Sequence, residues 1–95
     1  MPRFHVRDTF EIPERRLFVM AGSAVEGEIQ AGMFVRLPFN SSLAMTLRIH
    51  CIEFARRHGS EDVCLCIFSE PDLAETLRGM DIGDETFEIT TNGSD

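Results

Sequence analysis

The 95-residue sequence has no tryptophan, no tyrosine and no lysine. Without lysine it cannot contain the GxxxxGK[ST] loop that holds nucleotide phosphates, so we expect no binding of GTP or ATP. Without tyrosine or tryptophan it lacks side chains on which single-stranded nucleic acids commonly stack. It also has no run of about 18 apolar residues, the length that spans a bilayer. These absences argue against a nucleotide-dependent enzyme and against a transmembrane protein.

Cysteine is scarce, and the odd count of Cys51, Cys64 and Cys66 does not form a disulfide framework. Cys64 and Cys66 would share one face of a strand, where Cys51 or His50 from a neighbouring strand could complete a zinc site. Their spacing is not the CxxC of structural zinc sites, so we predict packed thiols without metal or cofactor. A Cys–His nucleophile pair would need an orienting third group, which nothing in the sequence supplies. We therefore expect no catalytic residues and no enzyme.

The composition is that of an ordinary globular protein, with 43% hydrophobic and 26% charged residues. The N-terminal segment MPRFHVRDTF lacks the apolar stretch of a signal peptide, and we expect a cytoplasmic protein. Residues 1–90 are predicted to form a single domain. The small polar residues 91–95 are predicted to be a disordered tail.

Strand-like alternation of apolar and polar residues occurs throughout the chain. We predict strands over residues 4–12, 17–25, 33–37, 42–54, 62–68 and 86–90. Gly22 marks a bulge or bend in the second, and the apolar parity flips at Cys51–Ile52, so that Ile52 and Phe54 carry the apolar face. We interpret the flip as a β-bulge. Pro71 and the spacing of Leu73 and Leu77 predict one short helix over residues 71–79.

These elements predict an all-β fold: a six-stranded (five to seven) closed, Greek-key-like barrel with one short helix near residues 71–79. Closure would remove exposed strand edges. The residues predicted to be buried are Phe10, Ile12, Val19, Val35, Leu47, Ile49, Val63, Leu65, Phe87 and Ile89.

The order of elements resembles domain 2 of the translational GTPases of the elongation factor Tu type. The residues that carry the resemblance are Phe10-Glu11-Ile12, Arg15, the apolar run Leu17–Ala21, Gly22, Gly27, Ile29, Gly32 and Val35. It continues through residues 49–54, Val63, Leu65 and residues 79–84, and so spans residues 4–90. Gly27 and Gly32 stand where tight turns with positive φ are expected.

Two departures from this family limit what the resemblance implies. The family's Gly-Arg-Gly turn is replaced by Glu14-Arg15-Arg16, and these 95 residues do not include a GTPase domain. In the family, domain 2 packs on the GTPase domain and in some members helps to hold the aminoacyl end of tRNA. None of the family's tRNA-contacting residues can be placed on this sequence.

Charge is unevenly distributed along the chain. Residues 1–60 hold eight arginines and six carboxylates, whereas residues 61–95 hold one arginine and ten carboxylates. We therefore expect an acidic surface distinct from the arginine-bearing first strand, and a weak homo-oligomer in which the two surfaces meet. The candidate interaction surface consists of Arg3, His5, Arg7, Arg15, Arg16, Arg56 and Arg57. The alternative is that these arginines pair with Glu11, Glu14 and Glu53.

The leading hypothesis is a non-enzymatic macromolecular binding module with a protein partner, associated with translation if the resemblance holds. One alternative is binding of RNA or the ribosome through the N-terminal arginines, which predicts a steep dependence on salt. Another alternative is a small metal- or thiol-dependent enzyme. Nothing in the sequence names the partner or the biological process.

Overall fold

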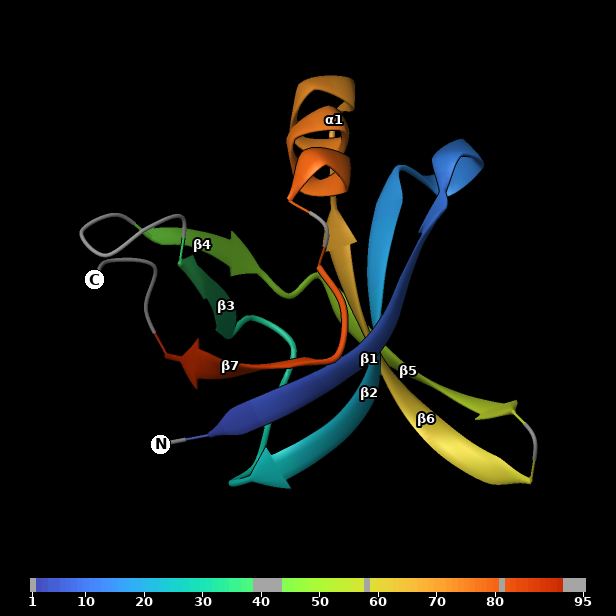
Figure 1. The fold of residues 1–95 in the computed structure, drawn as a ribbon, viewed down its shortest axis with the longest axis vertical. Coiled ribbons are helices and arrows are strands. Elements are labelled where there is room, and N and C mark those ends of the chain that lie inside the picture. The colour runs from blue at the N-terminus through green and yellow to red at the C-terminus, as the bar shows by residue number, and fades with distance from the viewer. Residues whose placement is uncertain (1, 39–43, 58, 81, 92–95) are drawn as a thin grey trace.

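The computed structural model describes residues 2–38, 44–57, 59–80 and 82–91 (Figure 1). The elements in chain order are β1 (Arg3–Ile12), the 3-10 turn η1 (Pro13–Arg15), β2 (Leu17–Glu26), β3 (Phe34–Pro38), β4 (Ala44–Arg48), β5 (Cys51–Arg57), β6 (Ser60–Phe68), α1 (Pro71–Gly79) and β7 (Glu85–Thr90). The prediction of an all-β domain with one short helix over residues 71–79 is confirmed. The predicted tail falls mostly on residues 92–95, outside the described residues.

The strands form one antiparallel sheet in the order β4-β3-β7-β1-β2-β6-β5. In the described residues its end strands, β4 and β5, do not pair with each other, so the sheet is not the closed barrel that was predicted. The connection Ile49–His50 joins the two ends instead. The Ile49 N–H donates to the Met33 carbonyl at 2.8 Å, and the His50 N–H donates to the Cys66 carbonyl at 2.8 Å. The two ends of the sheet are therefore linked by the Ile49–His50 segment and its backbone hydrogen bonds, and not by a ladder between β4 and β5. We call this segment the crossing.

This crossing also corrects the bulge predicted at Cys51–Ile52. β4 pairs with β3, whereas β5 pairs with β6 at the other end of the sheet. Leu47 and Ile49 are buried in the same core against which Ile52 packs. The apolar parity therefore flips because the chain leaves one strand and begins another, and the seven strands lie within the predicted range of five to seven.

The β2–β3 connection turns at Gly27 and Gly32, whose φ values are 76° and 96°. Both positive values were predicted, and they place these residues in backbone conformations that side chains disfavour. The Gly32 N–H donates to the Ile49 carbonyl at 2.9 Å. The connection therefore helps to fix the crossing.

A bulge next to Gly22 is confirmed, but its extra residue lies on β1. Val6 pairs with Gly22, and Asp8 pairs with the preceding residue of β2, so Arg7 is left without a partner position. A Cβ atom on Gly22 would lie 1.8 Å from the His5 carbonyl oxygen. Only glycine allows the two strands to approach this closely.

Beyond the bulge, the positions of β1 that would have faced inward face outward, and those that would have faced outward face inward. Phe4 and Val6 point into the core, whereas Phe10 pairs with Val19 on the outer face. Phe10 is consequently 41% exposed, against the prediction that it is buried. Ile12 is half-buried and packs against a second, outer cluster. This outer cluster consists of Leu17, Val19, Ala21, Cys64 and Cys66.

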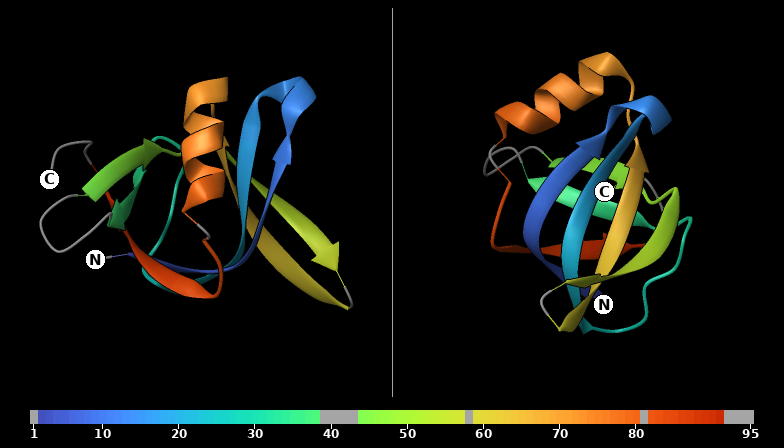
Figure 2. Two further views of the ribbon diagram at one scale, coloured as in Figure 1. Left: turned by 45° about the horizontal axis from the view of Figure 1, so that its top comes forward. Right: turned by 90° about the vertical axis from the view of Figure 1, so that its right-hand side faces the viewer.

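The remaining core predictions agree with the structure except at Val63, which is half-buried. Val19, Val35, Leu47, Ile49, Leu65, Phe87 and Ile89 are buried. Helix α1 lies across one end of the curved sheet (Figure 2). Leu77 joins the inner core with 1% exposure, and Leu73 and Met80 pack against it. Pro71 begins the helix, where its missing N–H costs no hydrogen bond.

Candidate functional site

The seven residues predicted to form an interaction surface lie in three separate places. They are Arg3, His5 and Arg7 on β1, Arg15 and Arg16 at η1, and Arg56 and Arg57 at the end of β5. Figure 1 shows the start of β1, the turn η1 and the end of β5 at three different corners of the molecule. The side chain of Arg57 lies outside the described residues. The fold does not gather the described members of this set into one patch.

Several of these arginines contact carboxylates. Arg3 Nη2 lies 3.3 Å from Glu26 Oε1, and Arg15 Nη2 lies 3.5 Å from Glu53 Oε2. Glu53 is one of the three carboxylates with which these arginines were expected to pair in the alternative interpretation, and its partner is Arg15. These pairs are about half exposed, and such pairs contribute about 0–1 kcal/mol each.

Arg16 contributes to the fold through its backbone conformation and its carbonyl group. Its φ is 55°, the left-handed conformation that ends η1. Its carbonyl accepts a hydrogen bond of 2.8 Å from the Ser69 N–H. Arg16 thereby ties the β1–β2 turn to the segment that begins α1.

The contact between Arg7 and Asp62 is the most buried ion pair in the described part of the chain. Arg7 Nη2 contacts Asp62 Oδ1, and the Asp62 side chain is only 11% exposed. Arg7 is on β1 and Asp62 on β6, with β2 between them in the sheet. The arginine side chain must therefore cross β2. A buried carboxylate that keeps its charge needs such a partner.

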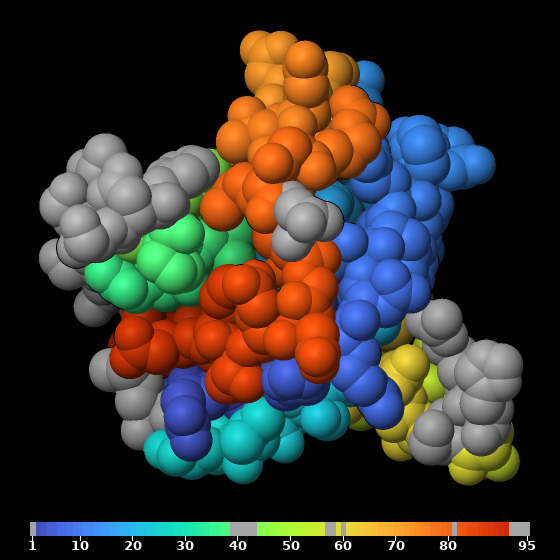
Figure 3. Space-filling view, in the orientation of Figure 1, coloured from blue at the N-terminus to red at the C-terminus, as the bar shows by residue number. Residues whose placement is uncertain are grey.

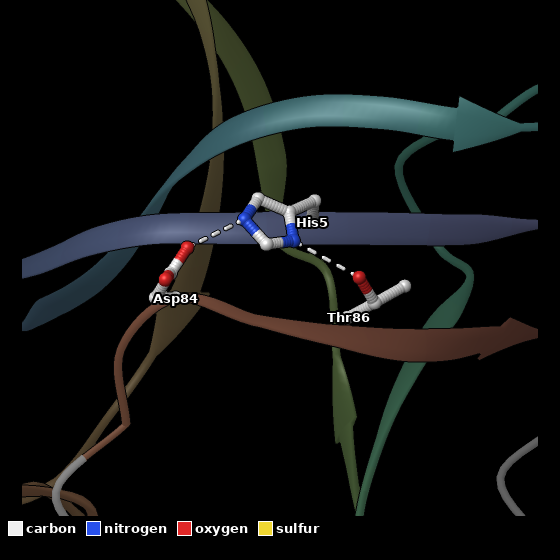
Figure 4. A network of polar contacts seen from close by, with 3 residues as sticks. All are labelled: His5, Asp84 and Thr86. Atoms are coloured by element: carbon white, nitrogen blue, oxygen red, sulfur yellow. Dashed lines mark hydrogen bonds and ion pairs between the residues drawn. The ribbon is translucent and has the colours of Figure 1, made fainter.

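His5 is held by two neighbours (Figure 4). Its Nδ1 lies 2.9 Å from Thr86 Oγ1, and its Nε2 lies 2.9 Å from Asp84 Oδ1. A histidine between a carboxylate and a hydroxyl has the composition of a hydrolytic triad. However, the Asp84 side chain is 89% exposed, and His5 lines neither the cavity beside η1 nor the cavity beside β4. The group serves to join β1 to the start of β7.

The predicted separation between an acidic and an arginine-bearing surface is wrong. β7 carries two carboxylates of the acidic half of the sequence, Glu85 and Glu88, and it lies directly beside β1. Asp62 contacts Arg7, and Arg36 Nη1 lies 4.0 Å from Glu88 Oε1. Carboxylates from residues 61–95 are therefore interleaved with arginines from residues 1–60.

The β5–β6 hairpin carries the most exposed large apolar side chain of the described residues. Phe54 is 66% exposed, although it had been placed on the apolar face. It pairs in register with Val63, which packs against the edge of the core. The hairpin projects away from α1 and β7 (Figure 1), and part of it stands at the lower right of the surface view (Figure 3). Phe54 lies beyond the edge of the core.

The outer face of the same hairpin gathers the thiols with a carboxylate. Cys51 pairs with Cys66, and Glu53 pairs with Cys64. The donor atoms of Cys51, Glu53 and Cys66 all lie within 4.8 Å of one another. The Cys51 thiol donates to Glu53 Oε2 at 3.7 Å. Burial, and then the neighbouring Cys51, raise the pKa of Cys66 to about 12, so this thiol is protonated at neutral pH.

Of the two ligands expected from the neighbouring strand, Cys51 belongs to this cluster and His50 does not, whereas Glu53 was not predicted. His50 is exposed, and its ring centroid lies 6.3 Å from that of Phe68. The missed signal was a Cys-x-Glu on one strand opposite a Cys-x-Cys on the next, because strand alternation places all four donors on one face.

A cavity of ≈ 260 Å³ lies between η1 and the start of α1. Its polar lining includes Arg16, Ser69, Glu11 and Arg78. Arg78 Nη1 lies 3.3 Å from both carboxylate oxygens of Glu11, so these two lining charges neutralise each other.

Comparisons with known proteins do not identify a relative: no family model, curated protein or solved structure matches the chain. The resemblance to domain 2 of translational GTPases stays a prediction from the sequence. No helix in the described residues is long and apolar enough to cross a membrane.

Proposed function

We propose that this protein is a non-enzymatic protein-binding module that takes an extended segment of its partner along the free edge of β5. The observation that carries the proposal is the 66% exposure of Phe54 on a strand that has one sheet neighbour among the described residues. Added strands bind through backbone hydrogen bonds, while alternate side chains supply specificity.

The edge of β5 has the features that such a partner needs. In the described residues, β6 is the only segment with which residues 51–57 form a ladder. Phe54 and Ile52 are two residues apart and lie on the same, inner face of β5. An added strand could therefore cover both with apolar side chains. Arg56 is exposed and has no carboxylate within 4.0 Å among the described residues. A partner segment with apolar residues beside an acidic one complements this edge.

A protein partner is favoured over RNA by the charges. The net charge of −7 opposes a phosphate backbone, and Arg3, Arg7 and Arg15 already contact carboxylates. The resemblance to domain 2 of translational GTPases supports a more specific version, in which the partner belongs to the translation apparatus. A separate GTPase is the corresponding candidate, since that family packs domain 2 against its GTPase domain.

The proposal is tested by affinity capture from lysate with the immobilised wild type, Phe54→Asp and Phe10→Asp. Phe10 is a matched control because it is also an exposed phenylalanine, 41%, but lies on β1. We expect proteins that bind the wild type and the Phe10 variant, that are lost with the Phe54 variant, and that survive nuclease treatment. Amide exchange of β5 should slow when the captured protein is added. Equal capture by all three variants, or capture abolished by nuclease, would contradict the proposal.

A further inference from the structure

We propose that the outer face of the β5–β6 hairpin is a zinc-binding site, with Cys51, Cys66 and Glu53 as its protein ligands. This inference is independent of the proposed binding edge. It departs from the sequence-based prediction of packed thiols without metal.

The register of two strands creates this set of donors. Cys51 and Glu53 are two residues apart on β5, and Cys66 lies directly opposite Cys51 on β6. All three side chains therefore leave the same face of the hairpin. Their ligand atoms lie within 4.8 Å of one another, whereas tetrahedral zinc with Zn–S bonds of about 2.3 Å separates its ligands by roughly 3.8 Å. The adjustment needed is about 1 Å at most, and Glu53 is an exposed side chain that can supply it.

The chemistry of the donors selects the metal. Two thiolates and one carboxylate suit a borderline-soft, tetrahedral ion, and they are poor ligands for magnesium or calcium. Zinc would displace the thiol protons of Cys51 and Cys66, releasing two protons to solvent. The bound site would carry a net charge of −1 from two thiolates, one carboxylate and Zn²⁺. Three protein ligands leave the fourth position of a tetrahedral ion to a water molecule.

Neighbouring residues fit this assignment. Arg15 Nη2 lies 3.5 Å from Glu53 Oε2, so the guanidinium can orient the carboxylate and balance the net negative charge. The Glu53 side chain is 51% exposed and Cys51 is half-buried, which leaves an entry path to the buried Cys66. Cys64 lies on the same face, but its thiol is not among the donors within 4.8 Å. We therefore place Cys64 outside the ligand set.

The test uses the full chain, stripped of metal and kept reduced so that Cys51 and Cys66 remain thiols. Zinc is titrated in competition with a chromophoric chelator, and Co²⁺ is added separately as a spectroscopic probe. The wild type should bind one ion per chain, show the visible bands of tetrahedral cobalt with a thiolate charge-transfer band, and unfold at a higher temperature with zinc.

Substitutions then distinguish a ligand set from a general affinity of thiols for metal. Cys51→Ser and Glu53→Ala should each weaken zinc binding by more than about 100-fold, beyond the effect of losing an outer-shell residue. Cys64→Ser is the matched control and should stay within about tenfold of the wild type. Circular dichroism checks folding, and the exposed Glu53 keeps the test valid if a thiol variant fails to fold. The proposal is overturned if Cys51→Ser binds zinc as tightly as the wild type does. It is also overturned if Cys64→Ser loses the cobalt bands.

Discussion

Replacing Gly22 by alanine should remove a large part of the stability of this domain. The added Cβ would lie 1.8 Å from the His5 carbonyl oxygen and 2.9 Å from the His5 carbonyl carbon. Both are backbone atoms in the β1–β2 ladder, so no side chain can rotate to relieve the clash. The strands would have to separate by more than about 1 Å at the bulge, and overpacking of this kind costs about 3 kcal/mol or more.

The assay is urea unfolding followed by far-ultraviolet circular dichroism, since the chain has no tryptophan or tyrosine to report by fluorescence. A domain of this size has about 5–10 kcal/mol of stability, so the variant should lose a third of it or more. Gly79→Ala is the control, because a Cβ there meets nothing within 4 Å and alanine favours a helix. A free energy of unfolding for Gly22→Ala within about 0.5 kcal/mol of the wild type would refute the close approach of the two strands.

Three further predictions concern the ion pair, the thiols and the helix. Arg7→Ala should reduce the free energy of unfolding by about 1–3 kcal/mol, because it leaves the buried Asp62 carboxylate without this partner, whereas Arg3→Ala should change it by less than about 1 kcal/mol. The Cys66 thiol has an ordinary pKa of 9.0, and folding raises this pKa to about 12. Between these two pH values the folded chain keeps a proton that the unfolded chain has lost. The free energy of unfolding should therefore be constant below pH 9.0 and fall as the pH rises toward about 12. The absence of lysine and tyrosine makes this fall assignable to thiols, and a Cys66→Ala variant with the same alkaline slope would contradict it. Leu77→Ala should cost about 2–5 kcal/mol in urea unfolding, and a change below about 0.5 kcal/mol would mean that α1 does not seal the core.

The fold could be predicted as far as local patterns determine it. The helix over residues 71–79 follows from Pro71 and the spacing of its leucines, and the positive φ at Gly27 and Gly32 follows from their turn positions. The crossing at Ile49–His50 could not be predicted, because a change of strand and a bulge produce the same flip of parity. Distinguishing them requires knowing that β4 and β5 pair with different strands, which is a property of the whole sheet.

The site predictions depended on the same non-local information. Phe10 and Phe54 both alternate as buried residues, yet one is turned outward by the bulge at Arg7 and the other lies beyond the edge of the core. The cluster of Cys51, Glu53 and Cys66 forms only when β5 and β6 adopt their observed register. A shift of one residue would put Glu53 opposite a residue of the other face, and no sequence pattern alone fixes that choice.

Apolar residues are buried on both faces of β2 and β6. Val19, Ala21, Cys64 and Cys66 lie on the outer face, yet none is more than 5% exposed. Two arginines extend over this face: Arg7 crosses β2 to reach Asp62, and Arg15 spans β2 and β6 to reach Glu53. Arginine stems commonly cover apolar surface while the guanidinium stays in water. These two arginines, which the sequence suggested as a surface for a partner, are instead paired with carboxylates of the same sheet. Of the two sheet edges that no strand of the described chain covers, those of β4 and β5, the projecting edge of β5 is the one that carries the 66% exposed Phe54.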